Sequence, residues 1–125
     1  MAHVRWKDEP DEHDYPAALD FLELLVEPAA AGSLVERLRS APIVTKKAKD
    51  ILRASELRIL PADEVHVARD IDKVHDDKQL SPILLVRGNL SAPRPLVIAD
   101  GYHRVCAVYA LDADAEVPCR IAERE

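Results

Sequence analysis

The stretch Ala99-Asp100-Gly101-Tyr102-His103-Arg104 gathers side chains that can do chemistry within one predicted turn. A strand is expected to end there, the glycine permits a sharp turn, and a helix then opens with two potential cations in its first turn. The free N–H groups and the positive dipole end of such a helix start attract anions. His103 and Arg104 add side-chain donors, and the planar Arg fork suits phosphate. Asp100 can cap the helix, or hold a divalent metal or a substrate hydroxyl.

Each residue of this turn also has a purely structural interpretation. Asp100 can be a helix cap, Gly101 a turn residue, Tyr102 a core residue, His103 a capping donor and Arg104 an ion-pair partner. Short motifs carry little weight without their structural context. The elements that position the turn therefore decide between the two interpretations.

Other polar residues can take part in a site. Lys78 precedes an apolar run and can reach a phosphate, or it can be a solvated helix end. The acidic opening from Asp8 to Asp14, with His13 inside it, can form a metal cluster, but its irregular spacing favours a frayed, hydrated terminus. Tyr102 or Trp6 can stack on a base, although an aromatic content of 4% provides no stacking platform.

The two cysteines allow a metal site and a structural role. Cys106 lies three residues after His103 on the same predicted helix face, and Cys119 lies on a later strand, so the three side chains can converge. Tetrahedral zinc would still lack a fourth protein ligand. We expect two buried apolar thiols and no metal site, because free cysteine is among the most buried residue types.

The elements around the turn follow from hydrophobic periodicity, which changes character along the chain. Amphipathic spacing and caps predict a helical first half, and apolar runs then predict short strands between helices. This order predicts a mixed α/β (α+β) fold, a small mixed sheet with flanking helices. We expect a helical extension over residues 1–56 packed on a domain over 57–125. The expected helices are 14–27, 33–42, 45–54, 62–78 and 103–111, and the expected strands are 57–60, 83–86, 96–98 and 117–121.

Composition excludes several classes of protein. The 125 residues are 48% hydrophobic, enough for one domain with a real core. A formal charge of −6 argues against a protein whose main partner is duplex DNA. The basic stretch at 37–58 is interpreted as a solvated helix face, with DNA binding as the remaining alternative. Short apolar runs, no apolar leader and two cysteines predict a cytoplasmic protein that neither spans a membrane nor is secreted.

The turn and its surroundings resemble the ParB/sulfiredoxin-like superfamily, whose members place a Gly-x-His-Arg or Gly-Glu-Arg-Arg turn between a strand and the helix that holds nucleotide phosphates. The run Leu80-Ser81-Pro82-Ile83-Leu84-Leu85-Val86-Arg87-Gly88 is similar to the helix and Pro-Ile strand that precede that motif. Residues 57–61 resemble the opening strand, and Val117-Pro118-Cys119-Arg120-Ile121 the closing one. The resemblance covers residues 57 to 122.

The resemblance implies a domain that binds ATP or CTP, with magnesium as a companion ion and the phosphates at the turn 101–104. Sulfiredoxins carry a Cys, and partition-type members a Glu, at the position of Tyr102, and the latter continue into a DNA-binding domain. Neither activity is therefore expected. Asp-Gly-Tyr-His-Arg is most similar to the turn of superfamily members that are small-molecule kinases. By that likeness Asp100 and His103 are catalytic candidates, while Gly101, His103 and Arg104 hold phosphate.

These expectations leave two classes of function open. The first is a nucleotide or phosphate-ligand binding domain with phosphotransfer or nucleotide hydrolysis activity, in which Glu64 or Asp63 is a candidate for a further catalytic acid. The second is a non-catalytic interaction module whose helices at 15–54 dock a protein partner or a second copy. A DNA-associated protein of ParB type is the remaining alternative. Truncating His103 and Arg104 separates the first two, since a ligand site loses affinity and a structural motif loses stability.

Overall fold

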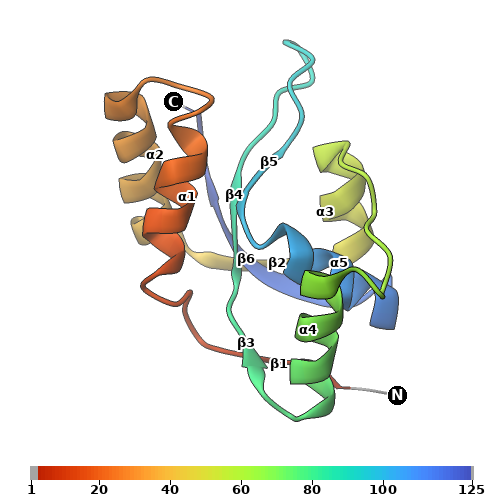
Figure 1. The fold of residues 1–125 in the computed structure, drawn as a ribbon. Helices are drawn as coiled ribbons and strands as arrows, with labels where there is room; N and C mark the ends of the chain where they lie inside the picture. Colours follow the sequence, from red (N-terminus) through yellow and green to blue (C-terminus); the bar gives the residue numbers. More distant parts are fainter. Residues whose placement is uncertain (1–2, 125) are drawn as a thin grey trace.

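The computed structural model describes residues 3–124, which form a mixed α/β fold of one central sheet with helices on both faces (Figure 1). Its elements in chain order are β1 (Arg5–Trp6), α1 (Asp14–Leu22), α2 (Pro28–Ser40), β2 (Ile43–Lys47), α3 (Ala48–Ser55), α4 (Val65–His75), β3 (Gln79–Leu80), β4 (Ile83–Val86), β5 (Val97–Asp100), α5 (Tyr102–Leu111) and β6 (Glu116–Ala122).

The main sheet has the strand order β2-β6-β4-β5. Strands β4 and β6 run parallel, whereas β2 pairs antiparallel with β6 and β5 pairs antiparallel with β4. In the β4/β5 register Asp100 lies opposite Leu84, so the end of β5 and the turn after it lie beside the start of β4. A separate two-stranded parallel ladder joins β1 to β3.

Alternating side chains of the sheet divide the core into two layers, because successive residues of a strand point to opposite faces. On β4, Ile83 and Leu85 pack with residues of α3, α4 and α5, whereas Leu84 and Val86 pack with residues of α1 and α2. Figure 1 shows this arrangement, with α1 and α2 on one side of the strands and α3, α4 and α5 on the other. The four β4 side chains are each at most 2% exposed.

The structure confirms the strands expected at 83–86, 96–98 and 117–121 and the helix at 103–111 to within three residues. The helix expected over 62–78 is also present, although it covers only 65–75. The first helix ends at Leu22, five residues before the expected end. The second begins at Pro28 and not after Ser33, because proline is favoured in the first turn of a helix, where its missing N–H costs no hydrogen bond.

The expectation of an entirely helical first half is wrong for residues 43–47. These residues form β2 on the free edge of β6, with Ile43 opposite Arg120 and Lys47 opposite Glu116. The run Ile-Val-Thr supplies three β-branched residues, which favour strands. The strand expected at 57–60 is absent: these residues join no ladder, and the side of β6 away from β4 is occupied by β2.

The acidic opening is not a frayed, hydrated terminus. Strand β1 pairs with β3, and the Ser81 hydroxyl accepts a hydrogen bond from the Asp11 backbone N–H at 2.9 Å. Asp14, the first residue of α1, is only 4% exposed. Burial of that carboxylate brings the start of α1 against the turn at Asp100. Within residues 3–124, none of the helices has the length and apolar character needed to cross a bilayer.

Candidate functional site

The turn before α5 depends on a glycine with left-handed backbone geometry. Gly101 is the N-cap of α5 with φ of 108°, a conformation that side-chain-bearing residues rarely adopt. A Cβ atom at this position would lie 2.5 Å from Ile83 Cδ1 and 2.8 Å from Arg104 Nη2. No side chain of the described residues caps the helix, so the N–H groups of its first turn face the space in front of it.

The interpretation of Asp100 as the helix cap is wrong, because its carboxylate pairs with Arg104. Arg104 Nη2 donates to Asp100 Oδ2 at 2.6 Å, and Nη1 donates to Asp14 Oδ2 at 3.2 Å. Asp14 Oδ2 also accepts from the Ser81 hydroxyl at 2.5 Å. We call this group the carboxylate cluster; it consists of Asp14, Ser81, Asp100 and Arg104. It connects the start of α1, the residues just before β4, the end of β5 and the start of α5.

The carboxylate cluster lies in a partly buried environment. The Arg104 side chain is 14% exposed, Asp14 6% and Asp100 20%. Burial raises the pKa of Asp100 to about 6; the Arg104 charge opposes this rise, and the nearby Asp14 carboxylate adds to it. When two carboxylates share one guanidinium, the negative charge of one raises the free energy needed to ionise the other. Asp100 is therefore a carboxyl group that exchanges its proton close to neutral pH.

A groove of about 330 Å³ opens in front of the carboxylate cluster and the first turn of α5. Its walls come from the start of α1, one face of α4, the end of β5 and the start of α5. The residues that line this groove are His13, Asp14, Ala17, His66, Arg69, Asp70, Lys73, Asp100, Gly101, Tyr102, His103 and Arg104.

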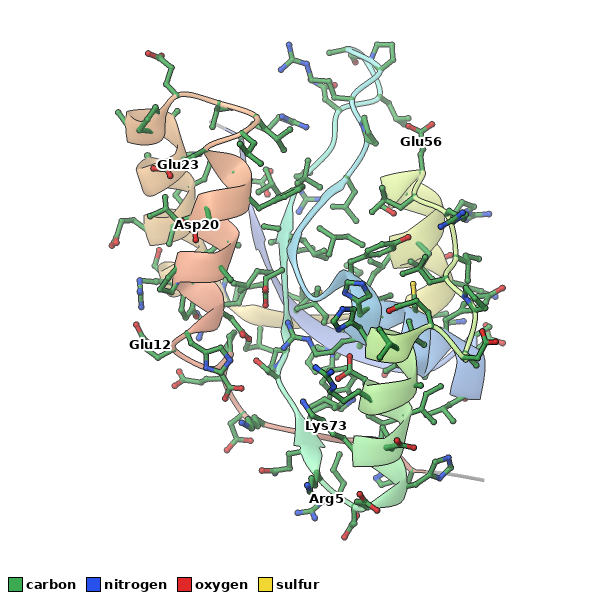
Figure 2. All side chains as sticks on the ribbon, in the orientation of Figure 1. Arg5, Glu12, Asp20, Glu23, Glu56 and Lys73 are labelled. Carbon is green, nitrogen blue, oxygen red and sulfur yellow. The ribbon has the colours of Figure 1, made fainter. Side chains whose placement is uncertain are left out.

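The α4 wall is the part of this groove that sequence reasoning missed. His66, Arg69, Asp70 and Lys73 all line the groove, and Figure 2 shows Lys73 on α4. The signal was present in the sequence: these polar residues recur at intervals of three and four, so they share one face of a helix. Asp70 is only 8% exposed, and its nearest cation is Lys73 Nζ at 3.7 Å.

His103 stands at the rim of the groove among other ionisable groups. Its ring centroid lies 4.8 Å from that of His66 and 5.4 Å from that of Tyr102. Its Nε2 atom is 4.0 Å from Glu64 Oε1. The Glu64 carboxylate also caps α4, since Oε1 accepts from the His66 backbone N–H at 2.7 Å. The structure thus brings His103 and Glu64 together, whereas Asp63 is exposed and lines no part of the groove.

The remaining candidates lie at varying distances from this groove. Tyr102 lines it, but its hydroxyl donates to the Arg58 carbonyl and burial raises the pKa of this phenol. Lys78 lies in a neighbouring groove with Asp77 and Ser81 and does not line the groove at Asp100. Trp6 is half-buried in β1, packed against the core.

Both cysteines are buried in the core, as expected. Burial raises the pKa of Cys106 and that of Cys119, the latter to about 11, so both thiols keep their protons at neutral pH. Within residues 3–124, His103, Cys106 and Cys119 do not form a metal-ligand group.

A different trio has its ligand atoms close enough together to hold a cation. One ligand atom each of Asp11, His13 and Asp14 lies within 4.8 Å of the others. Lys7 Nζ already contacts Asp11 Oδ1 at 2.6 Å, and Arg104 already contacts Asp14. A divalent cation would therefore have to compete with two resident positive charges.

The basic stretch at 37–58 is partly neutralised by acidic neighbours. Arg39 pairs with Glu12 at 2.6 Å, and Lys49 pairs with Asp114 at 2.6 Å. Arg53 lies 3.4 Å from Asp50 on its own helix. These pairs reduce the positive charge available to a phosphate backbone. The expected solvated helix face is interrupted, because Lys46 and Lys47 lie on β2.

We find no match to this chain among protein-family models, curated proteins or solved structures.

Proposed function

We propose that the groove between α4 and the start of α5 binds a phosphate-bearing ligand, and that a nucleotide such as ATP or CTP is the ligand class that fits best. The observation that carries this proposal is the convergence of Arg69, Lys73 and His103 on the uncapped N-terminus of α5. Helix N-termini and flexible cations are the ordinary means by which proteins hold phosphate. The likeness of Asp-Gly-Tyr-His-Arg to the ParB/sulfiredoxin-like turn supports the same proposal.

Within this proposal the cations have different tasks. Arg104 is held by two carboxylates, so its first task is to keep α1 and the turn in position. Within residues 3–124, Arg69 and Lys73 extend from α4 without a hydrogen-bonded partner, and Lys73 Nζ lies 3.7 Å from Asp70. Arg69 and Lys73 are therefore the cations that pair with the ligand's negative charge. The backbone N–H groups after Gly101 donate hydrogen bonds to its phosphate oxygens. Lys78 belongs to the neighbouring groove and reaches only a ligand that extends that far.

The charge of the groove predicts a pH dependence. Arg69, Lys73 and Arg104 are formally balanced by Asp14, Asp70 and Asp100 when all three carboxylates are ionised. Protonation of Asp100, whose pKa is raised to about 6 by burial, removes one of the negative charges. Phosphate binding therefore strengthens as the pH falls toward 6, or as a magnesium ion offsets the carboxylates.

We further propose phosphoryl transfer or nucleotide hydrolysis as the reaction class. Asp100 is the candidate for the general base, because a carboxyl group with a pKa near neutrality both accepts and releases protons effectively. His103 is the candidate for stabilising charge on the transferred group, with Glu64 4.0 Å away to orient its ring. The cytoplasm is the proposed location, since both cysteines are free.

A second candidate function is a non-catalytic interaction module. The observation that favours it is the carboxylate cluster itself, in which the motif residues Asp100 and Arg104 hold two layers of the fold together. In that case the motif is a structural device, and the groove needs no ligand.

Thermal unfolding with ATP, CTP, GTP or no nucleotide, each with and without magnesium, separates these candidates. A ligand present at about a hundred times its dissociation constant adds about 2.7 kcal/mol to the native state, a clear rise in melting temperature. We expect one nucleotide to give this rise in the wild type and a much smaller one in Arg69→Gln/Lys73→Gln. Arg53→Gln is the matched control, because it removes an exposed cation that lies outside the groove.

Arg104→Ala distinguishes a structural role from a ligand contact. The variant is expected to be less stable than the wild type without any nucleotide, because it leaves the partly buried Asp14 and Asp100 carboxylates without the guanidinium between them. If no nucleotide stabilises the wild type at either pH 6 or pH 8, within about 0.5 kcal/mol, the proposed ligand site is wrong and the interaction module takes its place.

A further inference from the structure

An apolar, acidic surface lies at the end of α1. Phe21, Leu24 and Leu25 are 42%, 82% and 56% exposed, although they are large hydrophobic residues. Asp20, Glu23 and Glu27 surround them in sequence, and no Lys or Arg occurs anywhere from Asp8 to Glu36. Figure 2 shows Asp20 on α1 and Glu23 just after its end. We call residues 20–27 the acidic patch.

A basic, apolar hairpin lies at the same end of the molecule. Residues 87–96, called here the arm, connect β4 to β5 and project beyond the sheet (Figure 1). Two backbone hydrogen bonds between Asn89 and Arg94, of 2.8 and 2.9 Å, hold its two sides together. Leu90 at the tip is fully exposed, at 101% of its reference area.

The arm carries positive charge and no acidic residue. Its charged side chains are Arg87 and Arg94. Arg87 pairs with Glu123 at 2.7 Å, whereas Arg94 forms no ion pair within residues 3–124. The tip therefore offers one large apolar side chain beside an unpaired guanidinium.

We propose that two copies of this chain associate, with the arm of each copy on the acidic patch of the other. The arm is apolar and positive, the patch is apolar and negative, and both belong to the same chain, so a second copy supplies the complementary surface. Opposite charges around an apolar contact favour encounter and fix its register.

The position of the two surfaces favours a closed dimer over an open chain of molecules. The arm and the turn after α1 lie at the same end of the fold (Figure 1). A two-fold axis at that end brings both arms onto both patches at once, so each contact is made twice. The contacting surfaces are small, which predicts a reversible dimer with a dissociation constant on the order of micromolar. This association is independent of the phosphate-binding groove.

Sedimentation analysis from about 1 μM to about 1 mM, the range that covers weak association, measures the dimer directly. We expect a monomer–dimer equilibrium that weakens as salt is raised. Leu90→Ser and Leu24→Ser are each expected to weaken dimerisation at least tenfold. Val65→Ser is the control, since Val65 is a 63% exposed apolar residue on α4, outside both surfaces.

Cross-linking between two different variants tests which surfaces meet. Cys106 and Cys119 are buried, so cysteines introduced by Leu24→Cys and Leu90→Cys are the accessible thiols among the described residues. A short bismaleimide is expected to join the two variants when they are mixed, and to join neither variant to itself to the same extent. A chain that stays monomeric at about 1 mM overturns the proposal. So does a dimer that survives Leu90→Ser and Leu24→Ser, or a mixture that gives no cross-link between the two variants.

Discussion

The substitution Asp100→Asn tests the electrostatics of the carboxylate cluster. An Asn side chain keeps an oxygen that accepts from Arg104 Nη2, so the 2.6 Å hydrogen bond can persist while the negative charge is removed. In the wild type, burial raises the pKa of Asp100 from its ordinary 3.8 to about 6. That difference corresponds to about 3 kcal/mol, at 1.36 kcal/mol for each pH unit.

The direction in which the stability of Asp100→Asn changes with pH, relative to the wild type, follows from the protonation of Asp100 in the folded and unfolded states. Between about pH 4 and pH 6 the folded protein holds a proton at Asp100 that the unfolded chain has released. The contribution of this group to stability is therefore greatest below about pH 4 and is lost as the pH rises through 6. The variant has no such loss, so its stability relative to the wild type rises by up to about 3 kcal/mol between about pH 4 and about pH 7.

Urea denaturation followed by circular dichroism at both pH values measures this difference. Comparing two pH values cancels every effect of the substitution that does not depend on pH. Asp72→Asn is the matched control, because Asp72 is an exposed carboxylate on α4 outside the cluster. A stability difference that stays constant with pH, or that falls as the pH rises, would refute the conclusion that burial dominates at Asp100.

Two further predictions concern the turn and the buried thiols. Gly101→Ala is expected to destabilise the protein by about 1–3 kcal/mol, as measured by urea denaturation. The backbone there has φ of 108°, and the new methyl group would collide with the Ile83 side chain. Unchanged stability would mean that the turn does not need glycine. Cys106 and Cys119 are expected to react with a thiol reagent such as DTNB only as the protein unfolds, since both are buried and burial raises the pKa of Cys119 to about 11. Rapid labelling of the native protein would contradict their placement in the core.

The sequence by itself determined the apolar strands β4 and β5 and the turn from β5 into α5. Runs such as Ile83 to Val86 are apolar at every position, and only a strand covered on both faces buries all of them. Gly101 between an apolar run and a helix start identified the turn, since glycine tolerates the left-handed conformation that the turn requires. These features depend on neighbouring residues, so they can be recognised from a single sequence.

Only the tertiary structure decided which segment pairs with β6 on the side away from β4, and what Arg104 contacts. Residues 43–47 and 57–60 both contain branched apolar side chains, but it is residues 43–47 that pair with β6. Asp14 is 90 positions from Arg104, and nothing in the sequence between them indicates that the two side chains meet. The α4 wall of the groove is similar, since its polar stripe has the spacing of an ordinary solvated helix face until α5 packs beside it. Long-range contacts of this kind result from the packing of whole elements, and a single sequence carries no separate signal for them.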